Sequence, residues 1–240
     1  MYNKWDSLLS EFRRLGGIAE NVCQKEGEFG RGIFSINPSL RSRIYTPSEV
    51  MVKENDIYLE GNKLRIKKEK EYNHEIRHFF NFYQDNFSWG AGGKEITESF
   101  ENGLSIFPSD LKKSINQYTL VDLEERHKGN WEEVIMRQFL NARVLNFRND
   151  RVIAPVWELV NHNVRSLPFI ATKDGISTPN YSPISGEITF SYNNIGPLTR
   201  FFSHGFFSEE SIVYSVPFFI SLKDSGIQIH CKGKSLHDDS

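Results

Sequence analysis

A helical segment interrupts a chain whose other parts consist of short strands, and this order limits the folds open to it. Residues 72–87 repeat apolar side chains at a helical period, and a second such pattern runs through residues 120–145. On both sides of this region, short aromatic and β-branched runs are bounded by Gly, Asn and Pro turns, as strands are. The sequence therefore predicts an α+β fold with a helical insertion between two β-rich parts.

The changes of pattern along the chain set the predicted boundaries. The residues expected to form each part are an N-terminal helix in 1–16, a first β-rich part in 17–67, the helical insertion in 68–147, a second β-rich part in 148–234 and a tail in 235–240. The first boundary coincides with a strong stop signal, because Gly16 and Gly17 end the first helical pattern. At this length the chain is able to bury one sizeable core.

Composition narrows the classes of function. The 240 residues carry a formal net charge of −2, which lacks the positive excess of proteins that bind nucleic acid or anionic membranes. No apolar run approaches the ~20 residues that a bilayer requires, and residues 1–6 lack the features of a secretory signal. We therefore expect no nucleic-acid or membrane partner, with the cytoplasm as the default location.

Metal ligands are sparse in this sequence. Cys23 and Cys231 are far apart and have no CxxC spacing, so a cysteine-based zinc site is excluded and two reduced thiols are favoured over a disulfide. His74 and His78 have a spacing compatible with zinc, but without a further ligand an exposed helix face is the better interpretation. We expect no metal.

Four short segments carry the chemical information. They are residues 30–34 (Gly-Arg-Gly-Ile-Phe), 161–162 (Asn-His), 186–192 (Gly-Glu-Ile-Thr-Phe-Ser-Tyr) and 202–207 (Phe-Ser-His-Gly-Phe-Phe). Each has an ordinary structural explanation: a glycine hairpin, a polar turn, a strand with a buried tyrosine, and core phenylalanines. The first lacks the third glycine and the helix of a dinucleotide-binding loop.

In this order the four segments resemble the SET-domain protein methyltransferases, in the branch typified by the Rubisco large-subunit lysine methyltransferase. The resemblance covers about residues 17–207 and rests on the order of the motifs more than on any one of them. It implies a β-rich fold of several small sheets, a helical insertion that splits the domain, and one cleft that joins the early and late motifs. It further implies S-adenosylmethionine as cofactor and a protein as substrate.

The resemblance also assigns roles to individual residues. The residues implied to contact the cofactor are Gly30, Arg31, Gly32, Phe34, Arg143, Asn161, His162 and Tyr192. The amide of Asn161 has the donor and acceptor that suit the zwitterionic methionine end of the cofactor. Arg143 suits the cofactor carboxylate. Alternatively, Arg143 is a solvated helix residue, or Arg148 or Arg137 takes this role in another register. Tyr192 is implied to be the catalytic residue that aligns the target nitrogen.

The closing segment departs from the family pattern. Residues 196–199 (Gly-Pro-Leu-Thr) replace an Asn-Ala-Glu element, and His204, or Ser203 in another register, replaces a tyrosine that often lines the lysine channel. His204 and Phe206 are the candidates for contact with the substrate, while Phe206 also suits the hydrophobic core.

This departure leaves several functions open. Lysine is the expected target, and a protein-histidine methyltransferase of the same fold is the first alternative. A non-catalytic adaptor with this fold and an unrelated α+β binding module are the others. Relatives usually continue into a helical domain that holds the protein substrate, so here we expect the insertion, the tail or a partner to hold it. The target protein, the number of methyl groups and the oligomeric state are not predicted.

Overall fold

The computed structural model describes residues 4–28, 30–118, 121–179, 186–192, 197–206, 218–221 and 228–231. The elements of the first β-rich part are α1 (Lys4–Arg14), β1 (Ile18–Glu20), β2 (Val22–Gly27), β3 (Gly30–Ser35), β4 (Arg43–Pro47), η1 (Ser48–Val50), β5 (Val52–Lys53), η2 (Glu54–Asp56), β6 (Ile57–Glu60) and β7 (Lys63–Ile66). The helical elements that follow are α2 (His74–Phe87), η3 (Trp89–Ala91), α3 (Gly93–Ser105), α4 (Ser109–Tyr118), α5 (Leu123–Arg126) and α6 (Trp131–Arg143).

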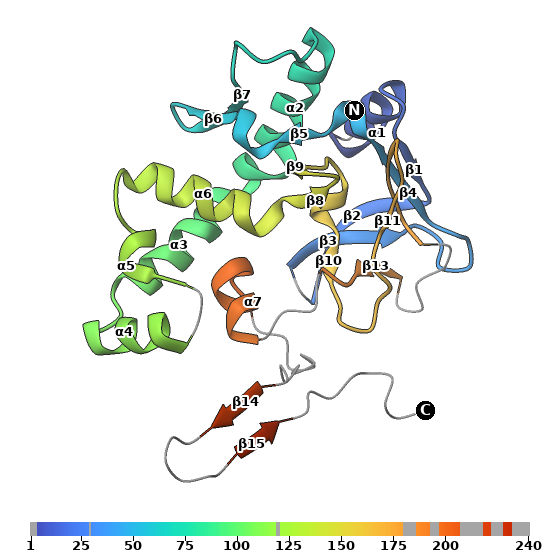
Figure 1. The fold of residues 1–240 in the computed structure, drawn as a ribbon. Helices are drawn as coiled ribbons and strands as arrows, with labels where there is room; N and C mark the ends of the chain where they lie inside the picture. The colour runs from blue at the N-terminus through green and yellow to red at the C-terminus, as the bar shows by residue number, and fades with distance from the viewer. Residues whose placement is uncertain are drawn as a thin grey trace.

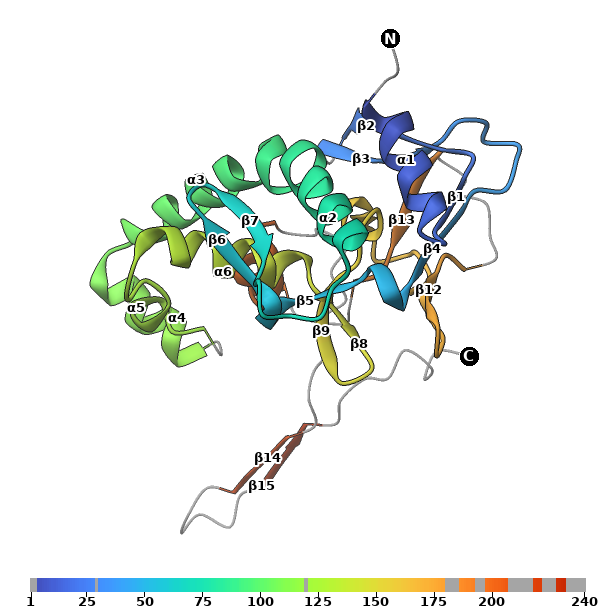
Figure 2. The ribbon, with the colours of Figure 1, turned by 90° about the horizontal axis from the view of Figure 1, so that it is seen from above.

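Strands return after α6. The remaining elements are β8 (Leu145–Phe147), β9 (Asp150–Ile153), η4 (Trp157–Leu159), β10 (Asn161–His162), β11 (Ile170–Ala171), β12 (Gly175–Ser177), β13 (Glu187–Phe190), α7 (Pro197–His204), β14 (Phe218–Ser221) and β15 (Gln228–Cys231). Both ribbon views place α3 to α6 on one side of the molecule and the strands β1, β4, β12 and β13 on the other (Figures 1 and 2).

Three of the small sheets join strands from before and after the helices. Their strand orders are β1-β4-β12-β11, β10-β13-β3-β2 and β5-β9-β8. In the second of these sheets β13 runs antiparallel to β3, with Glu187 opposite Phe34, while β10 and β13 are parallel. The two β-rich parts are therefore one folded unit, which the helical region interrupts in sequence but not in space.

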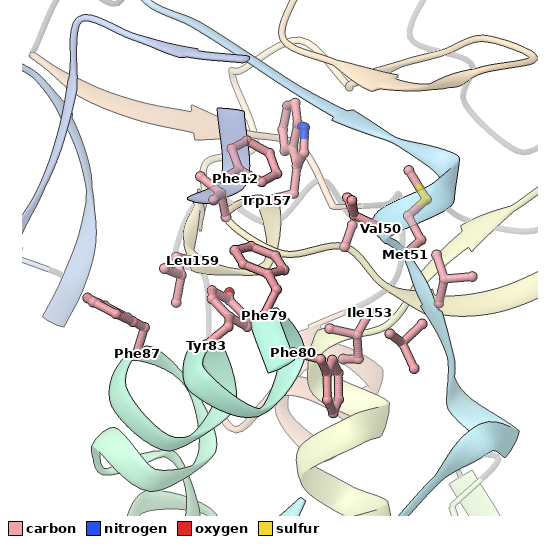
Figure 3. Close-up of a cluster of buried hydrophobic side chains, with 14 of the residues drawn as sticks. Phe12, Val50, Met51, Phe79, Phe80, Tyr83, Phe87, Ile153, Trp157 and Leu159 are labelled. Carbon is pink, nitrogen blue, oxygen red and sulfur yellow. The ribbon is translucent and has the colours of Figure 1, made fainter. Parts of the chain in front are cut away.

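Helix α2 links the helical region to the sheets. It begins at a side-chain cap, because the Asn73 carboxamide oxygen accepts a hydrogen bond from the Ile76 N–H at 2.8 Å. Its apolar face is buried, and Figure 3 shows Phe79 and Tyr83 pointing toward Trp157 and Leu159. The rings that the periodicity placed on one helical face are therefore the rings that fill the main core.

Two strand predictions need correction. The loose alternation of residues 18–23 predicts one strand, but the structure has two, β1 and β2, separated at Asn21, whose φ is +54°. The apolar run of residues 152–157 likewise predicts a strand, but β9 ends at Ile153, and Val156, with φ +70°, is the N-cap of the 3₁₀ turn η4. A β-branched residue with positive φ is an outlier, so local propensity favoured the wrong structure at this place.

Other elements follow the sequence pattern closely. The insertion divides as expected near residues 129–130, between α5 and α6. The helix α7 was not expected. Residues 212–216, whose β-branched and aromatic side chains predict a strand, and the tail predicted over 235–240 lie outside the described residues. No helix in the described ranges combines the length and apolar character needed to cross a bilayer.

Candidate active site

Asn161 lies at the centre of a small polar cluster that three strands build. Its Nδ2 donates to Glu187 Oε1 at 2.9 Å and to the Arg31 carbonyl at 3.3 Å. The two partners come from β13 and β3, the neighbouring strands of the same sheet. With Nδ2 engaged in this way, the amide oxygen of Asn161 has no hydrogen-bond partner among the described residues.

Gly32 makes this cluster possible. A methyl carbon added at Gly32 would come within 2.5 Å of Glu187 Oε1 and 2.7 Å of Asn161 Nδ2, closer than real side-chain contacts. Only a glycine lets the β3 backbone approach these polar groups so closely. Phe34 lies two residues further along β3, opposite Glu187, and so shares the same face of the sheet.

Gly30 and Arg31 have different positions from Gly32. Gly30 has φ +82°, and a side chain there would meet open space. A glycine is therefore favoured by the backbone conformation of the turn between β2 and β3, and not by crowding. The guanidinium of Arg31 donates to the Ala91 carbonyl and lies 3.9 Å from Glu26. Its side chain thus ties this hairpin to the helical region, while its carbonyl is the part that meets Asn161.

His162 and Tyr192 form an aromatic group beside the Asn161 cluster. The Tyr192 N–H donates to His162 Nδ1 at 3.1 Å, and the two rings lie 5.2 Å apart. The Tyr192 hydroxyl donates to the Val160 carbonyl at 2.7 Å. Helix α7 brings His204 to 5.4 Å from the Tyr192 ring, and Phe206 lies 6.0 Å from His162.

A cavity of about 150 Å³ opens next to these rings. Its lining residues are Ala142, Arg143, Val144, Leu145, Asn146, Trp157, Glu158, Phe169, Phe190, Tyr192 and His204. Of the predicted site residues, Arg143, Tyr192 and His204 therefore meet here, whereas Gly32 and Asn161 meet at the polar cluster. His162, the neighbour of Asn161, connects the two places through its hydrogen bond from the Tyr192 N–H and a tilted ring contact with Tyr192.

Burial shifts the pKa values of His162, His204 and Tyr192. It lowers the pKa of His162 and of His204 to about 4 in each case, with the nearby charge of Arg200 acting in the same direction. Both imidazoles are therefore neutral at physiological pH. Burial also raises the pKa of Tyr192 to about 12, so its hydroxyl keeps its proton.

Glu158 is the one carboxyl group among the cavity's lining residues. It is 7% exposed, and this burial raises its pKa, while the charge of Arg143 opposes the rise. Tyr83, Gln84 and Ser88 also favour its charged form, although none of them reaches the geometry of a full hydrogen bond to the carboxyl oxygens. The cavity thus combines aromatic walls with one cation and one buried acidic group.

Sequence reasoning missed two residues of this site. Glu187 lies within a recognised motif, and its signal was an acidic residue at the start of a strand that contains Ile188 and Phe190. Arg200 is buried in α7, with its guanidinium 6.0 Å from the Phe206 ring centre. Among the described residues, no group of three or more His, Cys, Asp or Glu side chains gathers as a metal site would require.

Comparison with solved structures identifies the class of fold. Rubisco LSMT bound to AdoMet aligns over 94% of this chain and 61% of its own, with a TM-score of 0.50 and 11% identity. The SET domain of LSMT bound to lysine and AdoHcy aligns over 92% and 61%, with a TM-score of 0.45 and 11% identity. This chain has the SET-domain fold, which confirms the predicted architecture of small sheets with helices between them.

The sequence alone is remote from characterised proteins. No known protein-family profile and no curated protein sequence matches the chain. The chain also spans 61% of the length of either solved structure. At this identity the likeness establishes the fold alone.

Proposed function

We propose that this chain transfers a methyl group from S-adenosylmethionine to a side-chain nitrogen of a protein, with lysine as the target. The observation that carries the proposal is the convergence of Gly32, Asn161 and Glu187 on one polar cluster, next to a cavity that Tyr192 lines. These residues come from distant parts of the sequence. Support also comes from the fold, which is shared with a structure of Rubisco LSMT bound to AdoMet.

The polar cluster suits the amino-acid end of this cofactor. An α-ammonium group needs acceptors, and the cluster offers the Asn161 amide oxygen, the Glu187 carboxylate and backbone carbonyls of β3. Gly32 leaves the β3 backbone open for close approach. When bound, S-adenosylmethionine supplies an electrophilic methyl group on a sulfonium. Asn161 and Glu187 would hold its polar end and so fix the direction of that methyl group.

The cavity suits the acceptor side chain. A lysine amine attacks only in its neutral form, and burial beside the Arg143 cation lowers the pKa of a second cation in the same space. The Tyr192 hydroxyl donates a hydrogen bond to the Val160 carbonyl, so its oxygen can accept a hydrogen bond from the amine. Tyr192 would therefore orient the nitrogen, and alignment of the reacting atoms supplies much of the rate.

Histidine is the second candidate target, and His204 is the observation that favours it. The cavity is lined by the rings of Trp157, Phe169, Phe190 and Tyr192, and a neutral His204 completes the wall. An imidazole matches such walls by stacking. It is also largely neutral at pH 7 without any help from the site.

The proposal is tested by methyl transfer from isotope-labelled S-adenosylmethionine to pooled peptides that contain lysine or histidine. Hydrolysis and mass spectrometry of the product distinguish methyl-lysine from methyl-histidine. We expect Tyr192→Phe to lower kcat by about 100-fold, because misplaced reactants lose about this factor. Tyr58→Phe, whose hydroxyl donates to Glu60 on β6, serves as the matched control and should keep wild-type kcat.

The outcomes separate the candidate functions. Methyl-lysine supports the main proposal, and methyl-histidine replaces its target while keeping its chemistry. A Tyr192→Phe protein with the wild-type rate would remove Tyr192 from the site. A wild type that binds the cofactor but labels no acceptor, including protein extract, would favour a non-catalytic adaptor.

A further inference from the structure

Helix α7 presents two charged or titratable side chains to the acceptor side of the site. His204 lines the cavity and lies 5.4 Å from the Tyr192 ring. Arg200 is buried and acts electrostatically on Tyr192, His162 and His204. The position of this short helix therefore determines how that side of the site is shaped and charged.

The end of α7 is held by the helical region rather than by the sheets that carry the other site residues. Arg126 NH1 donates to the Phe202 carbonyl at 2.8 Å. Gln138 Nε2 donates to the Phe202 carbonyl at 3.3 Å and to the Ser203 carbonyl at 3.0 Å. The last carbonyls of a helix lack partners within the helix, so these donors complete its C-terminal turn.

Arg126 is itself fixed by a buried acid. Glu101 of α3 is 0% exposed, and its carboxylate accepts from Arg126 Nε at 3.1 Å and also from Arg126 NH2. His127 Nε2 lies 2.9 Å from the same carboxylate. A buried ion pair of this kind holds a defined geometry, because separating the partners leaves an unpaired charge in the interior.

Apolar packing attaches the same face of α7 to the helical region. Phe202 packs with Leu104 and Leu123 in a small core of its own. The Phe201 ring lies 5.3 Å from Phe100 in an edge arrangement. One face of α7 is thus bound to α3, α5 and α6, while its other side meets Tyr192. Figure 1 shows α7 between α6 and the sheet strands β10 and β13.

We propose that Arg126 and Gln138 are positioning residues, which set His204 and Arg200 against the acceptor cavity through the carbonyls of α7. The inference rests on the proposed function, and it assigns to the helical region a role in the reaction without contact to the reacting atoms. Loss of these donors leaves the polar cluster at Asn161 intact and moves only the acceptor side.

The test uses Gln138→Met in the full chain, because methionine keeps the length and volume of the side chain and removes the donor. We expect the Kd for S-adenosylmethionine to stay within twofold and kcat to fall at least tenfold. The ring signals of His204 in ¹H–¹⁵N spectra should shift. Glu133→Met, at an exposed position of the same helix, is the control and should change none of the three.

Arg126 gives a second test with an internal rescue. Arg126→Gln should lower kcat and shift the His204 signals further than Gln138→Met does, because it also removes the guanidinium from the buried Glu101 carboxylate, which keeps its contact with His127. Arg126→Lys keeps the positive charge but lacks a guanidinium that can donate to Glu101 and Phe202 at the same time. Its kcat should therefore lie between those of Arg126→Gln and the wild type. If Arg126→Gln does not fold, Gln138→Met alone decides.

The two proposals fail in distinguishable ways. Unchanged His204 signals and wild-type kcat in Gln138→Met would overturn the positioning role while leaving the methyltransferase proposal intact. Absence of cofactor binding in the folded wild type would overturn the proposed function. The shift of the His204 signals would then still decide whether Gln138 positions α7.

Discussion

Gly32 lies where β3 comes closest to the polar side chains of the site. The added carbon of an alanine would overlap the Glu187 carboxylate and the Asn161 amide, and both of these groups are also held by hydrogen bonds. Something in the cluster must then shift. Gly30, on the same strand, has open space around it but needs a positive φ.

We predict that alanine destabilises the fold at both glycines but affects cofactor binding at Gly32 alone. Gly32→Ala should destabilise the fold by about 1–3 kcal/mol through overpacking and should abolish cofactor binding. Gly30→Ala should cost about 1 kcal/mol through its backbone conformation and leave binding unchanged. Urea unfolding and calorimetric titration of both variants check this. Equal affinity of the two variants for the cofactor would contradict this prediction, because it would show that the site accommodates the added methyl group at Gly32.

The sequence alone identifies individual site residues when their side-chain chemistry suits a function and they lie in a motif. Asn161, Gly32 and Tyr192 stood out as parts of motifs, and all three lie at the candidate site. Glu187 was not singled out, because an acidic residue that begins a strand looks like a solvent-facing one until its neighbour across the sheet is known. The strain at Val156 was equally hidden, because tertiary packing overrides its preference for a strand.

Helix α2 contributes many of the buried apolar side chains that join the helical region to the sheets. Its first turn depends on the Asn73 side chain, which accepts from the Ile76 N–H. The rings of Phe79, Phe80 and Tyr83 are fully buried in the core. Capping is thus a local contribution to stability, separate from the packing of the rings.

Asn73→Ala should lower the free energy of unfolding by about 1 kcal/mol, because the first-turn N–H loses its acceptor. Phe79→Ala should cost about 3–5 kcal/mol, since it empties a fully buried ring position. Chemical denaturation followed by circular dichroism measures both. A larger loss for Asn73→Ala than for Phe79→Ala would contradict the assignment of most of the stability to packing.

Elements with a strong local period were predictable, and those made by distant contacts were not. The helices α2 and α6 follow apolar spacing and caps that the sequence shows directly. Helix α7 was not predicted, since its end depends on Arg126, which is far away in the chain. The pairing of β13 with β3 is equally non-local, and only the motif order suggested that these segments meet.

The whole molecule should lose stability in mild acid. His162 and His204 have a pKa of about 4 when folded and an ordinary pKa near 6.5 when unfolded. As the pH falls from about 6.5 to about 4, the unfolded chain takes up protons that the folded chain does not. The free energy of unfolding therefore falls over this range.

Urea unfolding midpoints measured from neutral pH down to about pH 4 test this dependence. His204→Phe removes one of the two groups and keeps a ring, so its midpoint should fall less steeply than that of the wild type. His74→Phe, at an exposed position on α2, is the control for replacing a histidine by phenylalanine away from the site. Identical slopes for wild type and His204→Phe would show that His204 does not contribute.

Calorimetric titration with S-adenosylmethionine tests the central claim most directly. We predict saturable one-to-one binding by the wild type, weakened by about 10- to 150-fold in Asn161→Ala through loss of a charge-assisted hydrogen bond. Asn102→Ala, at an exposed position of α3, should bind as the wild type does. No heat from the folded wild type, or equal affinity in Asn161→Ala, would contradict the placement of the cofactor at this cluster.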